Sequence, residues 1–239
     1  MVINEIYLSV QGESTWAGLP CVFIRTTACN LRCSWCDTAY AFTEGERTTL
    51  DKVMHRVNEL AEPFQSAGGQ KLPLVELTGG EPLIQKAAQP LMKSLCDAGY
   101  TVLVETSGAH DVSTVDARVH KIMDLKCPGS GEADRNRWEN LNHLSSDDEI
   151  KFVIASVEDY EWMKERIREH SLESRCPLLV SWVHPLTADQ RDPSLKPFPA
   201  DHTLIDRKDL VDRIVTDALP VRFQTQMHKI IWPPEQRGV

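Results

Sequence analysis

The chain has 239 residues, of which 41% are hydrophobic and 26% are charged, and its formal net charge at pH 7 is -9. This acidic balance argues against a protein that binds along a nucleic acid, because phosphate contacts require clustered Lys and Arg side chains. No stretch reaches the roughly 18 consecutive apolar residues of a membrane span. The amino terminus also lacks the basic and apolar regions of a secretory signal. We therefore expect a cytoplasmic protein that binds neither nucleic acid nor membrane.

The apolar pattern predicts strands and helices that alternate along most of the chain. Strands are expected at 3–10 and 21–26, followed by a helix at 50–61 with Thr48 as its cap. A strand at 74–77 and a helix at 87–98 come next, and Gly99 is expected to end this helix in the left-handed conformation. The remaining expected elements are strands at 101–105, 121–125 and 150–154, a helix at 157–169 capped by Ser156, a strand at 178–183, a helix at 209–218 and a strand at 221–224.

Strands that alternate with helices predict a parallel sheet covered by helices. The helices are fewer than a complete eightfold β/α barrel needs, so we expect one domain, residues 1–239, folded as an incomplete barrel. An open doubly wound sheet is the alternative. In both folds the polar residues that follow the strands gather at one edge of the sheet, where active sites form.

Three of the seven cysteines, Cys29, Cys33 and Cys36, lie close together in the segment 29–36. Structural disulfides are rare in the cytoplasm, so metal binding is the favoured interpretation. The C-x3-C-x2-C spacing supplies three thiolates, whereas a ferredoxin cluster uses four. The motif therefore predicts a 4Fe–4S cluster with one iron free to bind a substrate. A zinc knuckle is the alternative, although no second pair of Cys or His ligands follows.

The segment Gly79-Gly80-Glu81-Pro82 follows an apolar strand. Its glycines permit a close approach of the backbone to a ligand, and Glu81 would accept a hydrogen bond from a bound ammonium group. An ordinary strand-to-helix turn explains this segment equally well when it is taken alone. Together with the cysteine motif, it resembles the S-adenosylmethionine (SAM) site of radical SAM enzymes.

Further motifs narrow the resemblance. They are Ser9-Val-Gln-Gly-Glu-Ser14, Arg25, Cys36-Asp-Thr38, Glu105-Thr-Ser-Gly108, Asp124-Leu-Lys-Cys-Pro-Gly-Ser-Gly131 and the tail from Gln224 to Lys229. With these motifs the chain resembles the 7-carboxy-7-deazaguanine synthase family from residue 9 to about 229, and a C-terminal extension follows. The resemblance implies a partial β/α barrel of the radical SAM type, usually a homodimer.

The resemblance also implies a reaction. Members of the family convert 6-carboxy-5,6,7,8-tetrahydropterin to 7-carboxy-7-deazaguanine and ammonia, by hydrogen abstraction at C6 and ring contraction, in the queuosine and 7-deazapurine pathways. The implied cofactors are a 4Fe–4S cluster, SAM and Mg²⁺. A flavodoxin- or ferredoxin-like protein would donate the electron, because reduction at the cluster requires a low potential.

Roles for single residues follow from the same resemblance. Cys29, Cys33 and Cys36 would ligate the cluster, and the Thr38 hydroxyl would bind Mg²⁺. The residues expected to bind the pterin are Val10, Gln11, Gly12, Arg25, Thr78 and His228. The residues expected to contact SAM are Trp35, Cys36, Asp37, Gly80, Glu81, Ser107, Asp124, Leu125 and Lys126.

Several of these residues have a second interpretation. Arg25 could pair with an acidic neighbour at the surface, and Asp124 could form an ion pair with Lys126. Thr38 and Ser107 could be turn residues only, and His228 could be a packed or surface histidine. Two alternatives also exist for the function: a radical SAM activase that makes a glycyl radical on a partner protein, and a non-catalytic protein stabilised by zinc.

Overall fold

The structure is a computed structural model that describes residues 1–64, 72–233 and 235–239. In these ranges one sheet has the strand order β3-β1-β2-β4-β5-β6-β7-β8-β9. The strands are β1 (Val2–Val10), β2 (Pro20–Thr26), β3 (Glu46–Arg47), β4 (Leu74–Gly79), β5 (Val102–Thr106), β6 (His120–Asp124), β7 (Glu149–Ile154), β8 (Leu178–Trp182) and β9 (Arg222–Gln224). Every neighbouring pair from β2 to β9 is parallel.

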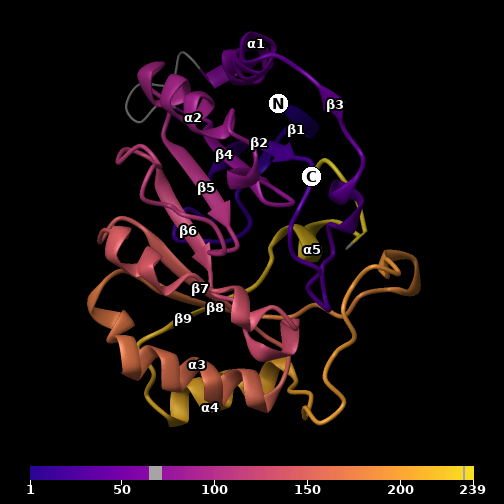
Figure 1. The fold of residues 1–239 in the computed structure, drawn as a ribbon, viewed down its shortest axis with the longest axis vertical. Helices are drawn as coiled ribbons and strands as arrows, with labels where there is room; N and C mark the ends of the chain where they lie inside the picture. The colour runs from indigo at the N-terminus through magenta and orange to yellow at the C-terminus, as the bar shows by residue number, and fades with distance from the viewer. Residues whose placement is uncertain (65–71, 234) are drawn as a thin grey trace.

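The strand order distinguishes the two predicted folds. A doubly wound sheet reverses its order at a switch point, whereas here the order from β4 to β9 follows the chain without reversal. Figure 1 shows the sheet curving from β1 and β2 through β5 to β8 and β9. Among the described residues no pairing joins the β3 edge to the β9 edge. The fold is therefore an incomplete β/α barrel, as predicted.

The prediction of an all-parallel sheet is wrong at its first edge. Strand β1 is antiparallel to both β2 and β3. Only the loop 11–19 joins β1 to β2, and a parallel pair needs a crossover of a dozen or more residues. Strand β3 was not predicted, because its two residues are exposed and have no apolar pattern.

The four predicted helices are present: α1 (Leu50–Ala61), α2 (Ala88–Asp97), α3 (Val157–His170) and α4 (Arg207–Thr216). A one-turn helix that was not predicted, α5 (His228–Ile231), follows β9. In Figure 1, α1 and α2 lie beside one end of the sheet, α3 and α4 beside the other, and α5 lies on the open side.

Two of the three predicted helix ends are confirmed. The Ser156 hydroxyl accepts a hydrogen bond from the Asp159 amide at 3.1 Å, and Gly99 has a φ of 84°. The prediction of Thr48 as the cap of α1 is wrong. Thr48 continues the pairing of the sheet edge, since its amide donates to the Met1 carbonyl at 2.9 Å. The cap is the next residue, Thr49, whose hydroxyl accepts from the Lys52 amide at 3.3 Å.

Alternation along the parallel strands separates an apolar outer face from a polar inner face. Outer residues of β2, β4 and β5, such as Ile24 and Val104, pack against α1 and α2. Outer residues of β6, β7 and β8, such as Phe152, pack against α3 and α4. The inner residues near the carboxyl ends of the strands are Arg25, Thr78, Glu105, Asp124, Lys151 and Ser181. The sheet therefore places polar groups from six strands on one concave surface.

Candidate active site

A cavity of about 240 Å³ lies at the carboxyl ends of the parallel strands. The predicted residues on its wall are Arg25, Cys29, Cys33, Trp35, Cys36, Asp37, Thr38, Thr78, Gly80, Ser107, Asp124, Lys126 and His228. These residues come from segments that are far apart in the sequence. They meet because parallel strands all end at the same edge of the sheet.

A second cavity of about 90 Å³ adjoins the first. The remaining predicted pterin residues, Val10, Gln11 and Gly12, lie on its wall together with residues from 235 to 239, the end of the chain. The two cavities share Glu13, Arg25, Asp37, Thr38, His228 and Lys229. The site therefore has two adjoining compartments, with the cysteine loop on the larger one.

The three motif cysteines open on the larger compartment as buried or half-buried thiols. Burial raises the pKa of Cys33 to about 11 and that of Cys36 to about 12. In the described ranges no three Cys, His, Asp or Glu side chains converge closely enough to bind one metal ion. A cubane binds each thiolate at a different iron, so thiols that surround a cavity fit a cluster better than a four-ligand zinc ion.

The Gly79-Gly80 pair allows two segments of the chain to pack closely. A Cβ at Gly80 would lie 2.1 Å from the Ala28 carbonyl oxygen, so no larger residue fits beside the start of the cysteine loop. The Glu81 amide donates to the same Ala28 oxygen at 2.8 Å. The sequence predicted that the backbone of these glycines lies close to a ligand. The structure shows that the backbone at Gly80 also lies close to the backbone at Ala28.

The structure does not place two predicted SAM residues on the wall of the site. The Glu81 carboxylate is fully buried and accepts from the Thr106 hydroxyl at 2.9 Å and from the Ser107 amide at 2.7 Å. Its oxygens are therefore directed at the chain rather than at a ligand. Leu125 points to the outer face of the sheet and packs in the core formed with α3 and α4.

Arg25 is paired with an acid, but inside the protein rather than at its surface. Its Nε lies 2.7 Å from Glu5 Oε1, and its Nη2 donates to the Tyr7 hydroxyl at 2.9 Å. The guanidinium borders both compartments. An arginine fixed in this way can present its remaining N–H donors, which lie along the edge of the planar group, to a carboxylate.

Asp37 connects the cysteine loop to the C-terminal segment. Its carboxylate forms an ion pair with Lys229 of α5 and accepts from the Thr38 hydroxyl at 2.8 Å. Burial would raise the pKa of Asp37, but the Lys229 ammonium outweighs this effect and lowers the pKa. Asp37 therefore remains ionised beside Thr38.

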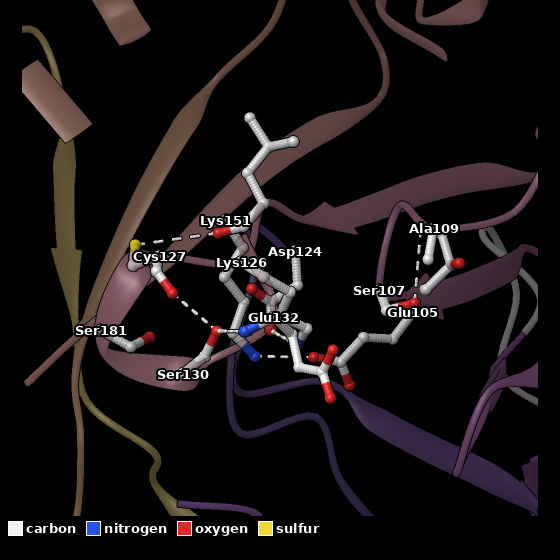
Figure 2. A network of polar contacts seen from close by, with 12 residues as sticks. Glu105, Ser107, Ala109, Asp124, Lys126, Cys127, Ser130, Glu132, Lys151 and Ser181 are labelled. Atoms are coloured by element: carbon white, nitrogen blue, oxygen red, sulfur yellow. Dashed lines mark hydrogen bonds and ion pairs between the residues drawn. The ribbon is translucent and has the colours of Figure 1, made fainter. Parts of the chain in front are cut away.

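Asp124 and Lys126 form the ion pair that was the alternative interpretation of these two residues. Lys126 Nζ lies 2.7 Å from Asp124 Oδ2, and Figure 2 shows both side chains near Glu105 and Lys151. Asp124 Oδ1 is buried and has no hydrogen-bond partner among the described residues. Asp124 thus has one oxygen free to accept a hydrogen bond from a ligand.

Four charged residues of the larger compartment were not predicted as site residues. They are Glu13, Glu105, Lys151 and Lys229, the partner of Asp37. Lys151 Nζ lies 3.0 Å from Glu13 Oε2 and 2.6 Å from Glu105 Oε1. The sequence did contain a signal for Lys151. This lysine lies in the middle of an apolar strand, and a lysine that is buried there must be paired with an acidic side chain. The motif Ser9–Ser14 contained Glu13, but its partner could not be identified from the sequence.

The comparisons with known proteins agree with these features. The profile of the radical SAM superfamily matches residues 23–175. A protein of Koribacter versatilis named 7-carboxy-7-deazaguanine synthase is 46% identical over 240 residues, covering 100% of each chain. The chain belongs to the 7-carboxy-7-deazaguanine synthase family of radical SAM enzymes.

Two further comparisons support membership of this family and the fold. A 7-carboxy-7-deazaguanine synthase of Chlorobaculum tepidum is 40% identical over 99% of this chain and 96% of its own. The crystal structure of QueE from Escherichia coli matches with a TM-score of 0.67 at 19% identity, covering 94% of this chain and 93% of that one. The second likeness supports the incomplete barrel.

Membership of the radical SAM family implies a 4Fe–4S cluster and SAM as cofactors. The residues present fit both groups. Three thiols border one cavity, and Asp124 Oδ1, which no described residue bonds, can accept a hydrogen bond from a ligand hydroxyl group. None of the helices in the described residues is long and apolar enough to span a membrane.

Proposed function

We propose that this protein is the radical SAM enzyme that converts 6-carboxy-5,6,7,8-tetrahydropterin to 7-carboxy-7-deazaguanine and ammonia. One observation carries the proposal: a compartment with three thiols adjoins a compartment with the Gln11–Gly12 loop, and Arg25 borders both. Such a site can hold a cofactor and a small anionic substrate in contact with each other. Proximity of this kind is a major source of rate enhancement.

In the larger compartment Cys29, Cys33 and Cys36 would ligate the cluster. When bound, the cluster and SAM supply the one-electron reduction and the radical chemistry that remove hydrogen from C6 of the pterin. Asp124 would accept from SAM through its free Oδ1, and Lys126 would orient Asp124. The other residues proposed to contact SAM are Trp35, Asp37, Gly80 and Ser107.

In the smaller compartment Arg25 would bind the pterin carboxylate through the donors that Glu5 and Tyr7 leave free. Val10, Gln11, Gly12 and His228 would line the pterin ring, and Thr78 would contact it from the larger compartment. Burial lowers the pKa of His228, against the opposing charges of Glu13 and Asp37. His228 would therefore be neutral and would offer one donor and one acceptor to the substrate.

Mg²⁺ would bind the Thr38 hydroxyl, beside the ionised Asp37. Thr38→Val replaces this hydroxyl with a methyl group of similar size. We expect the Mg²⁺ concentration for half-maximal turnover to rise by about tenfold or more, as when a metal site loses a supporting group. Thr38→Ser retains the hydroxyl and should behave like the wild type. An unchanged Mg²⁺ requirement in Thr38→Val would remove Thr38 from the metal site.

Anaerobic turnover tests the function. Reconstituted wild-type protein with the carboxytetrahydropterin, SAM, Mg²⁺ and a reductant should release 7-carboxy-7-deazaguanine, detected by mass spectrometry. Cys33→Ala should lose the complete cluster and all product. Cys96→Ala should retain both, because Cys96 lies on α2 and borders neither compartment. No product from wild-type protein with a full cluster would contradict the proposal.

Spectroscopy and metal analysis of the same reconstituted protein separate the two alternative functions. A glycyl-radical activase would make no deazaguanine and would leave a radical on a partner protein, visible by electron paramagnetic resonance. A protein stabilised by zinc would contain one tightly bound zinc and no iron, and Mössbauer spectra would show no cluster.

We also infer that residues 1–239 act as one domain in a cytoplasmic homodimer, reduced by a flavodoxin- or ferredoxin-like protein. The continuous sheet supports a single domain. Sedimentation of the purified protein tests the dimer, and turnover with purified flavodoxin or purified ferredoxin in place of the chemical reductant tests the donor. A monomer, or no turnover with either donor protein, would contradict the respective inference.

A further inference from the structure

The loop 11–19 connects β1 to β2 and reaches strands on the opposite side of the open sheet. The Ser14 amide donates to Gln224 Oε1 of β9 at 2.8 Å. The Thr15 amide donates to Glu149 Oε1 of β7 at 3.0 Å. No backbone pairing joins the two edges of the sheet in the described ranges, so these contacts link the first strands to the last ones.

The same loop contains residues proposed to bind the pterin. Gln11 donates through Nε2 to the Glu76 carboxylate of β4. The Gly12 carbonyl accepts from the Met227 amide at 3.1 Å, next to His228. The position of the loop therefore determines where both Gln11 and His228 lie in the smaller compartment.

Lys151, on the inner face of β7, is bonded to this loop. Its ammonium lies 3.0 Å from Glu13 Oε2 and 2.6 Å from Glu105 Oε1, and its side chain is only 6% exposed. Figure 2 shows Lys151 beside Glu105. Glu105 accepts from the Thr78 hydroxyl at 3.2 Å. A continuous series of polar contacts thus runs from the loop through Lys151 to Thr78.

We propose that Lys151 is a positioning residue for the pterin, which sets the separation between the Gln11–Gly12 loop and Thr78. Lys151 acts through Glu13 on one side and Glu105 on the other. Without its charge, two carboxylates would face each other in a buried space, and their repulsion would move the loop away from β5. This inference rests on the proposed function, because it concerns the substrate of that reaction.

The charges around Lys151 favour a positioning role over proton transfer. Burial would lower the pKa of Lys151, but the attraction of Glu105 and Glu13 outweighs burial and raises the pKa well above its usual value. Burial would likewise raise the pKa of Glu105, but Lys151 outweighs it and lowers that pKa. Both groups therefore remain charged when the enzyme works.

Lys121 provides a matched control within the same fold. Its side chain is also 6% exposed, and its ammonium lies 3.0 Å from Asp148. It is the second residue of β6, at the opposite end of the barrel from the site. It borders neither compartment. Lys121→Met thus removes an equally buried ammonium, paired with a single carboxylate, without touching the site.

Pterin binding to the reconstituted holoenzyme, measured by equilibrium dialysis without turnover, tests the proposal. Lys151→Met should weaken pterin binding by about tenfold or more, as expected for the loss of a buried charge-assisted contact. The KM for the pterin should rise in parallel, while the KM for SAM should stay within about twofold. Lys151→Arg should recover most of the binding. Lys121→Met should lower the midpoint of thermal unfolding and leave pterin binding and both KM values unchanged.

A second variant keeps the proposal testable if Lys151→Met does not fold. Ser181→Ala removes the hydroxyl that donates to Glu13 Oε1 at 3.3 Å, and it should weaken pterin binding by about threefold. Unchanged pterin binding in the variants that fold would overturn the positioning role and leave the proposed function intact. Wild-type holoenzyme that binds no pterin would overturn both.

Discussion

The chemistry of the three motif cysteines depends on burial as much as on their spacing. In a protein, the thiolate rather than the thiol binds iron. Burial raises the pKa of all three thiols, so they are protonated at neutral pH before the metal binds. Cluster assembly must therefore release protons from this loop.

Thiol alkylation measures this effect directly. In metal-free protein, iodoacetamide should modify Cys33 slowly at neutral pH, because a raised pKa leaves little thiolate there. The rate should continue to increase up to the pKa of about 11, whereas an unfolded peptide levels off near pH ~8.5. Peptide mass spectrometry over a pH series gives the rate for each cysteine. A rate that levels off at the same pH as the peptide would show that burial has no such effect.

Single residues differ in how well the sequence predicted their surroundings. The cysteines and Arg25 could be assigned to a site because their motifs are short and local. Glu81 was assigned to a ligand, but it accepts hydrogen bonds from Thr106 and Ser107. Lys151 was missed because its partners are distant in the chain. Partners at long range depend on strand order, which no local pattern contains.

At the scale of secondary structure, helix caps were predicted to within one residue. The error at α1 has a physical cause: the Thr48 amide pairs with the Met1 carbonyl and keeps Thr48 at the sheet edge, so the helix begins after Thr49, whose hydroxyl accepts the Lys52 amide. The cap of α3 was correct because Ser156 directly precedes the helix, has extended backbone angles and accepts the Asp159 amide through its side chain.

A pair of variants tests the position of the α1 cap. Thr49→Ala should lower the free energy of unfolding by about 1 kcal/mol, because the Lys52 amide loses its acceptor. Thr48→Ala should have a much smaller effect, since Thr48 pairs through its backbone. Urea unfolding followed by circular dichroism gives both values. Equal losses, or a larger loss in Thr48→Ala, would contradict the observed cap.

At the scale of the whole molecule, the open side of the barrel is covered by the C-terminal segment. The Arg237 guanidinium lies 3.7 Å from the centre of the Tyr40 ring and 2.7 Å from Glu44 Oε2. The Tyr40 hydroxyl donates to Glu5 at 3.0 Å, and Glu5 pairs with Arg25. Residues 235–239 are thus connected to Arg25, and they lie on the wall of the smaller compartment.

Arg237→Ala tests the contribution of this segment. The variant should raise the KM for the pterin about two- to fivefold, because an exposed cation–π contact is worth roughly 0.5–1 kcal/mol. The KM for SAM should not change. Arg213→Ala is the control, since Arg213 lies 5.7 Å from the Tyr160 ring and belongs to α4, away from both compartments. A pterin KM that is equal in the wild type and Arg237→Ala would show that the segment only covers the surface.

The amino-acid sequence was sufficient for the longer elements and the cysteine loop, because periodicity and short motifs are local properties of the chain. It favoured the incomplete barrel over a doubly wound sheet, but only the strand order decided between them. It could not show the antiparallel first edge, the two adjoining compartments or the buried contacts from Glu13 through Lys151 to Thr78. Those features arise when the curved sheet brings distant strand ends together and excludes water from them. Burial then determines which charges pair and which acceptors, such as Asp124 Oδ1, stay free for a ligand.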